Sequence, residues 1–214
     1  MILDDPLRDV LDSTAAKDST PGGGAIAALA GAMAAALGSM SCRYTTGPKF
    51  EDRADEIDRL LGILEDARAT IGDLAQKDIE AYGGYTAATG LPRSTDEEKA
   101  ARRAAIQEAL LGAMEVPLEI ARQCAQLLER IDEAEPLVNP YLVSDVGCAA
   151  ALAEAAFRAA RFNVLVNLGS LKAAEPRARA LEELASLDSR IRAASDRVLP
   201  AIESALAVEE EKTA

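Results

Sequence analysis

Hydrophobic residues recur at helical spacing along almost the whole chain. The longest regular pattern covers residues 51–89, where Ile57, Leu64 and Ile71 follow one another at seven-residue intervals. Apolar residues at this spacing share one face of a helix, and that face packs against neighbouring helices. The pattern therefore predicts a long bundle or coiled-coil helix over residues 51–89.

Five further segments predict helices, so the chain is expected to be all-α. These helices are expected over residues 6–16, 25–40, 95–135, 145–171 and 176–208, followed by a frayed end at 209–214. Alanine and leucine dominate the composition, aromatic residues make up only 3%, and tryptophan is absent. A core of small and medium aliphatic side chains favours helices over strands. At 214 residues, without a recognisable linker or repeat, the chain is expected to form one domain over residues 1–214.

Proline and polar residues mark a break in one predicted helix and the start of another. Pro117 is expected to bend the helix over residues 95–135, because proline removes a backbone hydrogen bond from a helix interior. Ser144 or Asp145 is a candidate cap for the next helix. As a cap, Asp145 would have a purely structural role.

The segment before the helix over residues 25–40 is rich in glycine. Thr20-Pro21 is followed by three glycines at 22–24, and the helix behind them is built from alanine, glycine and other apolar residues. This apolar run is shorter and richer in small residues than a membrane span, which needs about 20 apolar residues. We therefore expect a buried central helix, whose free N-terminal amides beside the glycines form a cradle for an anion or a carbonyl oxygen.

An acidic residue interrupts the apolar face of the helix over residues 51–89. The seven-residue interval continues from Ile71 to Asp78 and Tyr85, and Tyr82 lies one turn beyond Asp78. In one interpretation the apolar face simply drifts, since 3.6 residues per turn does not maintain a seven-residue repeat. In the other, Asp78 is buried, and desolvation raises its pKa and suits it to general acid or base catalysis.

Two amides, Asn163 and Asn167, lie one turn apart near the end of the helix over residues 145–171. Such a pair either links neighbouring helices or contacts a ligand. Asp145 lies 18 residues before Asn163, which is about 27 Å along a straight helix. If both residues contact a ligand, they hold opposite ends of a long molecule or belong to different sites across a dimer.

Composition excludes several classes of function. The chain has no histidine, which removes Ser-His-Asp and Cys-His catalysis, HExxH zinc sites and a histidine base, and no metal site is expected. A net charge of −13 argues against nucleic acid and membrane surfaces as partners, because both require a basic face. Cys42, Cys124 and Cys148 lack CxxC spacing, and no secretory leader is recognised, so we expect a cytoplasmic protein. The three thiols are expected to be buried and unreactive.

Eight sequence blocks occur in an order that is typical of one family. They are STPGGGAIAALAGA at 19–32, GPKF at 47–50, KDIEAY at 77–82, LP at 91–92, RAAIQ at 103–107, VPLEIA at 116–121, VSDVG at 143–147 and NVLVNL at 163–168. Together they resemble the methenyltetrahydrofolate cyclohydrolase and formiminotetrahydrofolate cyclodeaminase family over roughly residues 7–172. Pro48 stands where the family often has lysine, which removes a charge contact to the folate tail, and Tyr141 stands where a small polar residue is common.

The resemblance implies an up-and-down multihelical bundle with long helices, a homodimer and a reduced-folate substrate, with no separate cofactor. Members of the family either hydrolyse 5,10-methenyltetrahydrofolate to 10-formyltetrahydrofolate or close 5-formiminotetrahydrofolate to the methenyl form with loss of ammonia. The hydrolase is favoured here because the chain carries no fused formiminotransferase domain. The cyclodeaminase and a non-catalytic helical dimer or folate binder are the alternatives.

With such a ligand, specific residues are expected to take specific roles. Asp78 is expected to be the base, Lys49 to lie near the developing oxygen or the folate tail, and Asp145 to bind the amino edge of the pterin or act as a second carboxylate. Further substrate contacts are expected from Thr20, Pro21, Gly22, Gly23, Gly24, Tyr82, Ser144, Asn163 and Asn167.

Overall fold

A computed structural model describes residues 1–212, and every regular element in this range is helical. The elements are η1 (Ile2–Asp4), α1 (Leu7–Ala15), α2 (Gly23–Arg43), η2 (Pro48–Arg53), α3 (Ala54–Thr89), α4 (Asp96–Ala134), η3 (Pro140–Leu142), α5 (Val143–Ser170) and α6 (Ala174–Lys212). The all-α prediction is therefore confirmed.

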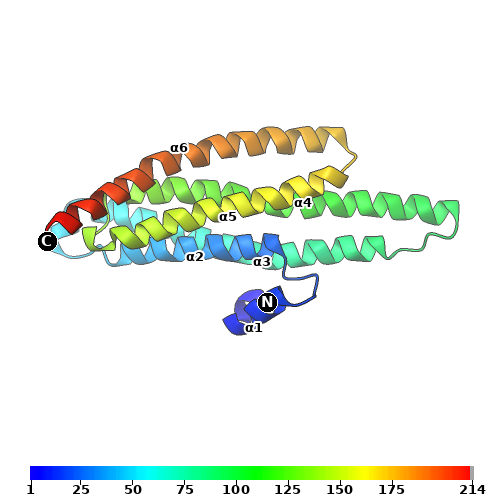
Figure 1. Cartoon of the computed structure of the whole chain (residues 1–214), viewed down its shortest axis with the longest axis horizontal. Helices are drawn as coiled ribbons and strands as arrows, with labels where there is room; N and C mark the ends of the chain where they lie inside the picture. Colours follow the sequence, from blue (N-terminus) through cyan, green and yellow to red (C-terminus); the bar gives the residue numbers. More distant parts are fainter. Residues whose placement is uncertain (213–214) are drawn as a thin grey trace.

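The five long helices run up and down along one axis and form an elongated bundle (Figure 1). α2 packs against α3 and α5, while α4 contacts α3, α5 and α6. α6 packs against α4 and α5, and α1 lies outside the bundle, on the side of α2 and α3 (Figure 1). One side of α2 and of α5 is consequently left without a covering helix.

The predicted apolar face of α3 packs in the core. Leu60, Leu64 and Ile71 are fully buried there, and two glycines of α2 let this face come close. A Cβ atom at Gly31 would lie 3.0 Å from the Ile71 Cγ2 atom, and one at Gly38 would lie 3.3 Å from the Leu64 Cδ1 atom. The small residues of α2 therefore set the short distance between α2 and α3.

α2 differs from its prediction in length and in burial. It has 21 residues and is long and apolar enough to cross a membrane, although 56% of its most apolar window is buried inside the protein. The predicted buried central helix is thus confirmed on the inner side of α2. Its outer side is less covered than expected, since Met33 is 49% exposed.

Several predicted boundaries and burials need correction. α5 begins at Val143 with no side-chain cap, so Ser144 and Asp145 lie in its first turn and the cap prediction is wrong. α6 continues to Lys212, so the prediction of a frayed end at 209–214 is wrong for 209–212, and residues 213–214 lie outside the described residues.

The three thiols do not share one environment. Burial raises the pKa of the Cys42 thiol to about 11 and that of Cys124 to about 12, as expected for unreactive core thiols. Cys148 is exposed, so the prediction of burial is wrong for this residue. Its place on the uncovered side of α5 accounts for the difference.

Candidate active site

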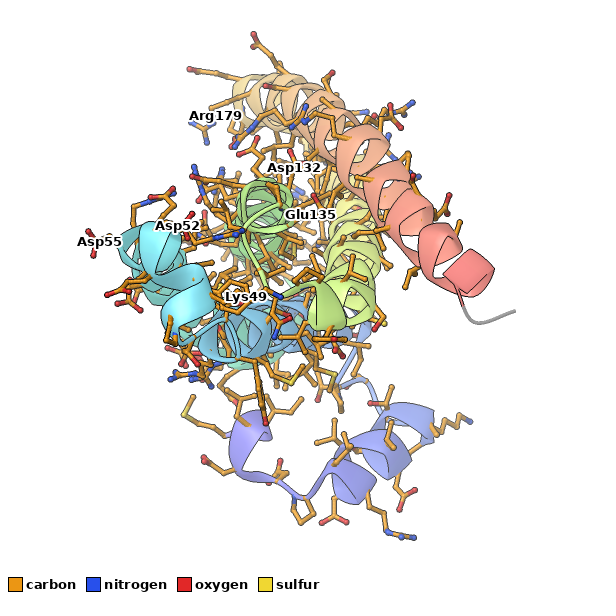
Figure 2. All side chains as sticks on the ribbon, turned by 90° about the vertical axis from the view of Figure 1, so that its left-hand side faces the viewer. Lys49, Asp52, Asp55, Asp132, Glu135 and Arg179 are labelled. Atoms are coloured by element: carbon orange, nitrogen blue, oxygen red, sulfur yellow. The ribbon has the colours of Figure 1, made fainter. Side chains whose placement is uncertain are left out.

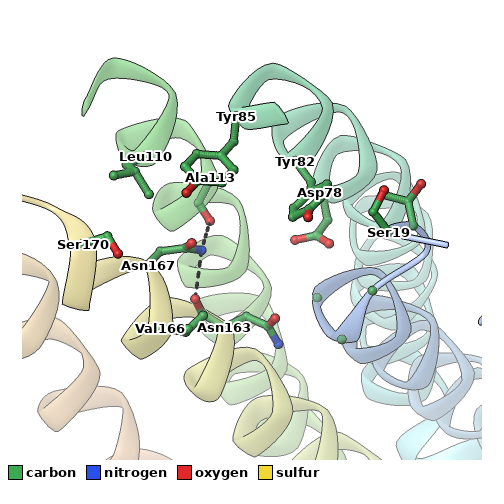
Figure 3. Close-up of a pocket in the computed structure, with 14 residues that line it drawn as sticks. Ser19, Asp78, Tyr82, Tyr85, Leu110, Ala113, Asn163, Val166, Asn167 and Ser170 are labelled. Atoms are coloured by element: carbon green, nitrogen blue, oxygen red, sulfur yellow. Dashed lines mark hydrogen bonds between the residues drawn. The ribbon is translucent and has the colours of Figure 1, made fainter. Parts of the chain in front are cut away.

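A pocket of about 340 Å³ opens between the start of α2, the second half of α3, the middle of α4 and the end of α5 (Figure 3). It is lined by Ser19, Thr20, Gly22, Gly23, Gly24, Asp78, Tyr82, Tyr85, Leu110, Ala113, Asn163, Val166, Asn167 and Ser170. These residues come from parts of the chain that are far apart in sequence. The up-and-down topology brings three of the sequence blocks, 19–32, 77–82 and 163–168, to one place.

Asp78 lies against the first turn of α2. Its carboxylate accepts a hydrogen bond from the backbone N–H of Ala25, and it lies over Gly24. A Cβ atom at Gly24 would be 2.6 Å from the Asp78 Oδ2 atom and 2.5 Å from Cγ. Only glycine at position 24 therefore leaves room for the carboxylate at the end of this helix.

Two opposing effects act on the Asp78 carboxyl group. Burial raises its pKa above the ordinary value, and the hydrogen bond from the Ala25 N–H lowers it, with burial the larger effect. Of the two interpretations of the interrupted apolar face, the structure supports the one in which Asp78 is withdrawn from water. Its catalytic role remains a prediction, because geometry alone does not test it.

Two tyrosines form one wall of the pocket beside Asp78. The rings of Tyr82 and Tyr85 are 6.3 Å apart between centroids and are tilted by 48°. Tyr82 is 41% exposed, so its ring is accessible to a flat ligand, while Tyr85 packs against the core. Tyr85 was not among the predicted contacts, although it lies on the same seven-residue interval as Asp78.

The two asparagines of α5 occupy the opposite wall. Asn163 Nδ2 donates to the Ala159 carbonyl at 2.9 Å and lies beside Gly23, where a Cβ atom would be 3.2 Å from it. Asn167 Nδ2 donates to the Ala113 carbonyl of α4 at 2.6 Å and to the Asn163 carbonyl at 2.9 Å. Asn167 therefore links two helices, as the first interpretation of this pair expects, and it also lines the pocket, while contact with a ligand stays a prediction.

Three of the predicted site residues lie far from this pocket in a single copy of the chain. Lys49 lies in η2 at the other end of the bundle, with its Nζ atom 5.9 Å from the centroid of the Phe50 ring (Figure 2). Ser144 and Asp145 lie in the first turn of α5, about 27 Å from Asn163 by the helical rise. One chain therefore does not unite Asp78 with Lys49 and Asp145.

The remaining predicted contacts divide between two cavities. Thr20, Gly22, Gly23 and Gly24 line the main pocket, as expected from their position before α2. Pro21 instead lines a smaller neighbouring cavity beneath the N-terminal segment, which Thr20 also borders. Within residues 1–207, whose side chains are described, no cluster of three or more cysteine, aspartate or glutamate residues is arranged to hold a metal ion.

The sequence and the fold match a known group of proteins. The profile of the formiminotransferase-cyclodeaminase family matches residues 6–186. The chain belongs to this family. The resemblance carried by the eight sequence blocks is thereby confirmed.

Relatives within the formiminotransferase-cyclodeaminase family differ in length. Methenyltetrahydrofolate cyclohydrolase of Methylorubrum extorquens is 37% identical over 205 residues, which are 95% of this chain and 99% of that protein. Formimidoyltransferase-cyclodeaminase of Rattus norvegicus is 36% identical over 168 residues, which are 78% of this chain and 31% of that protein. The chain thus matches the whole of the first relative and about a third of the second.

A solved structure of the same family supports the fold. The crystal structure of formiminotetrahydrofolate cyclodeaminase from Thermotoga maritima superimposes with a TM-score of 0.86 at 31% identity, over 96% of this chain and all of that chain. The family therefore includes relatives named for each of the two reactions, and the choice between them depends on chemistry at the pocket.

Proposed function

We propose that this chain hydrolyses 5,10-methenyltetrahydrofolate to 10-formyltetrahydrofolate with Asp78 as the base. The observation that carries the proposal is the position of the Asp78 carboxylate, half-buried in the pocket at the amide end of α2 with a raised pKa. The full-length match to the M. extorquens cyclohydrolase supports this reaction over the alternatives.

The size and lining of the pocket fit one end of a folate. A volume of about 340 Å³ lies at the lower end of the roughly 300–1,000 Å³ of small-molecule sites. Such a pocket holds a reduced pterin with its one-carbon bridge, and the longer benzoylglutamate tail extends along the surface outside. Tyr82 offers an aromatic face to the flat ring, while Asn163 and Asn167 offer polar groups to its edge.

Asp78 is suited to both halves of the hydrolysis. The water oxygen adds to the cationic carbon between N5 and N10, and the Asp78 carboxylate accepts one proton from the water. The bond from this carbon to N5 then breaks, N5 takes a proton from the Asp78 carboxyl, and the hydroxyl on the carbon loses its proton as the formyl carbonyl forms. One proton is released to solvent overall. Before attack, the negative carboxylate also stabilises the cationic substrate.

The start of α2 contributes backbone amides. The Ala25 N–H is engaged by Asp78, so the amides that precede it, at Gly23 and Gly24, are the ones placed to hold a substrate oxygen. The helix dipole reinforces this attraction for an oxygen that carries negative charge. The proposal needs neither a metal ion nor a separate cofactor.

Cyclodeaminase activity is the second candidate, and the similarity to the T. maritima cyclodeaminase structure favours it. Both reactions pass through a tetrahedral carbon that bridges N5 and N10. In the cyclodeaminase reaction N10 attacks the formimino carbon and ammonia leaves, so the carboxylate would move a proton from N10 to the departing nitrogen. The same pocket would serve this chemistry.

Two parallel assays distinguish the candidates. Purified protein is mixed with 5,10-methenyltetrahydrofolate, whose absorbance is followed at a pH where spontaneous hydrolysis is slow, and separately with the 5-formimino compound, from which ammonia is measured. Decay without ammonia release supports the hydrolase, and ammonia release identifies the cyclodeaminase. Activity in neither assay would contradict the proposal and leave a non-catalytic folate binder or helical dimer.

Asp78→Asn tests the role of the carboxylate. The amide keeps the shape of the side chain but cannot accept the proton, so we expect kcat to fall by about 10²- to 10⁴-fold with the fold retained. Asp73→Asn is the matched control, because Asp73 is an exposed carboxylate on the same helix. If Asp78→Asn and Asp73→Asn have equal kcat values, Asp78 is not the base.

We also propose that the protein is a homodimer and that its interface is the outer face of α2 and α5, which lie side by side (Figure 1). This α2/α5 face consists of Ile26, Leu29, Ala30, Met33, Ala36, Leu37 and Met40 of α2 with Cys148, Ala151, Ala155, Ala159, Phe162 and Val166 of α5. Phe162 is 66% exposed and Val166 69% exposed in the single chain. Although the chain carries a net charge of −13, the face contains no acidic residue. A large apolar patch with few charges fits a second copy better than it fits water.

A two-fold arrangement through this face would also bring the separated site residues together. In a two-fold interface both copies use the same patch. The α2 helices of the two subunits can then run antiparallel to each other across the interface. The Lys49 and Asp145 end of one copy would then lie over the end of the partner that holds the pocket. Val166 belongs to both the pocket and the α2/α5 face, so the partner would border the pocket mouth.

A further inference from the structure

Pro117 lies in the interior of α4 and leaves a gap in its hydrogen bonding. Proline has no backbone N–H, so the carbonyl four residues earlier, that of Ala113, has no partner in the regular helical pattern. The Asn167 side chain of α5 fills this gap, because its Nδ2 atom donates to the Ala113 oxygen at 2.6 Å (Figure 3). The carbonyl group that Pro117 leaves unpaired in α4 is therefore hydrogen-bonded by a side chain of α5.

The second hydrogen of the same amide is also engaged. Asn167 Nδ2 donates to the Asn163 carbonyl at 2.9 Å, so both of its N–H groups have acceptors. A flip of the amide would place Oδ1 against two carbonyl oxygens and is disfavoured. Within the part of the chain that the structure describes, no protein donor reaches Oδ1 of Asn167, and this oxygen is the polar atom that the side chain offers to the pocket.

The opposite side of the pocket contributes another acceptor. The Asp78 carboxylate lies across from the asparagines, and Asn163 also has its Nδ2 group bonded to a backbone carbonyl, that of Ala159. The Asp78 carboxylate and the Asn167 Oδ1 atom are therefore acceptors on opposite walls, whereas the amides at Gly23 and Gly24 are donors at the start of α2. A ligand that bonds to both acceptors carries N–H groups that reach each wall.

We propose that Asn167 is a specificity-determining residue whose Oδ1 accepts a hydrogen bond from an N–H of the reduced pterin, and that Pro117 is the positioning residue that holds Asn167 in this orientation. The inference rests on the proposed folate function. A reduced pterin carries N–H donors on its amino-bearing edge and on the reduced ring, which match a fixed acceptor. A site that fixes the acceptor discriminates against analogues that lack the N–H, because the bound ligand would cover the oxygen and leave it without a partner.

A double-mutant cycle tests both parts of the proposal. The variants are Asn167→Ala, Pro117→Ala and the combination, and KM and kcat for 5,10-methenyltetrahydrofolate are measured together with the thermal midpoint of unfolding. Pro200→Ala is the matched control, because Pro200 also lies within a long helix but is exposed and remote from the pocket. Equilibrium binding of tetrahydrofolate is measured for every variant, so that ligand contacts can be followed without turnover.

The cycle has a specific expected result. Asn167→Ala raises KM and weakens tetrahydrofolate binding by about fivefold, the value of one hydrogen bond, while kcat changes less than twofold. Pro117→Ala restores an N–H at position 117 that competes for the Ala113 carbonyl, so KM rises about two- to fivefold although the helix is not weakened. In the combined variant the KM effects do not add, since Pro117 acts only through Asn167.

Unfolding provides the second readout. Asn167→Ala lowers the unfolding midpoint when Pro117 is present, because the Ala113 carbonyl loses its donor. It lowers the midpoint less when residue 117 is alanine, because the helix then supplies the N–H. Pro200→Ala is expected to change neither KM nor binding.

Each outcome bears on one claim. Unchanged KM and binding in Asn167→Ala, with only the midpoint lowered, would show that Asn167 is a helix link and nothing more, and would overturn the proposal. Additive KM effects of the two substitutions would overturn the positioning role of Pro117. A wild-type protein that neither binds tetrahydrofolate nor turns over either folate would overturn the proposed function, and this inference with it.

Discussion

Gly24 is the position at which a single added methyl group tests the geometry of the pocket. In Gly24→Ala the new Cβ atom would lie 2.5 Å from the Asp78 Cγ atom, whereas ordinary contacts begin at 3.4 Å. The Cγ atom must therefore move by about 0.9 Å, and the Oδ1 atom, which would lie nearer to the new Cβ atom, must move further. This movement weakens its hydrogen bond from the Ala25 N–H and displaces it from the pocket.

The expected effects differ for stability and for activity. Overpacking lowers the free energy of unfolding by about 1–3 kcal/mol. Alanine in place of glycine within a helix raises it by about 0.5–1 kcal/mol. The net loss of about 1 kcal/mol corresponds to a fall of about 2–4 °C in the unfolding midpoint of a chain of this size. Displacing a catalytic group by about 1 Å costs about 10²-fold in rate, so kcat/KM should fall by this factor.

The assay is decay of 5,10-methenyltetrahydrofolate absorbance, with thermal unfolding followed by circular dichroism on the same preparations. Gly62→Ala is the control, because Gly62 is an exposed glycine of α3 with no atom within 4 Å of an added Cβ. It should raise the midpoint slightly and leave kcat/KM unchanged. If Gly24→Ala keeps kcat/KM within twofold of wild type, Asp78 either does not rest on Gly24 or is not required for catalysis.

Two further predictions concern titration and assembly. The raised folded-state pKa of Asp78 means that its ionisation opposes folding, so its contribution to stability is fully present below the unfolded pKa and is lost as pH rises through the folded pKa. Asp78→Asn has no such ionisation, so its free energy of unfolding minus that of wild type should increase as pH rises through the folded pKa. A difference that does not change with pH would contradict the raised pKa. Phe162→Glu places a charge on the α2/α5 face and should convert a dimer to a monomer in size-exclusion chromatography with light scattering, with Cys148 then reacting faster with a thiol reagent. Leu91→Glu, at an exposed turn off this face, should leave the dimer intact, and a wild-type monomer would refute the interface.

Much of the fold could be predicted because its determinants are local. The seven-residue repeat of Ile57, Leu64 and Ile71 gave α3 its buried face, and each of these side chains is buried as the repeat requires. The Ala- and Gly-rich run before Met40 correctly indicated an apolar helix with close neighbours. Helix ends were less predictable, since Ser144 and Asp145 have the chemistry of caps but lie within the first turn of α5.

The site could be predicted only in part, because pockets are made by residues distant in sequence. Asp78 stood out as an acid on an apolar stripe, and its pairing with Gly24 depends on how closely α2 and α3 approach. Lys49 and Asp145 carry suitable charges, yet the direction of the chain places both at the far end of the bundle, in η2 and in the first turn of α5. No local pattern contains this information.

The sequence by itself determined that this protein is helical, that it lacks histidine chemistry, and that its motif order is that of the formiminotransferase-cyclodeaminase family. These properties follow from residue type and spacing along one chain. Only the tertiary structure decided which residues share a pocket and that the gap left by Pro117 is filled by Asn167. A hydrogen bond between residues 54 positions apart depends on the packing of two helices, and that packing is a property of the whole bundle.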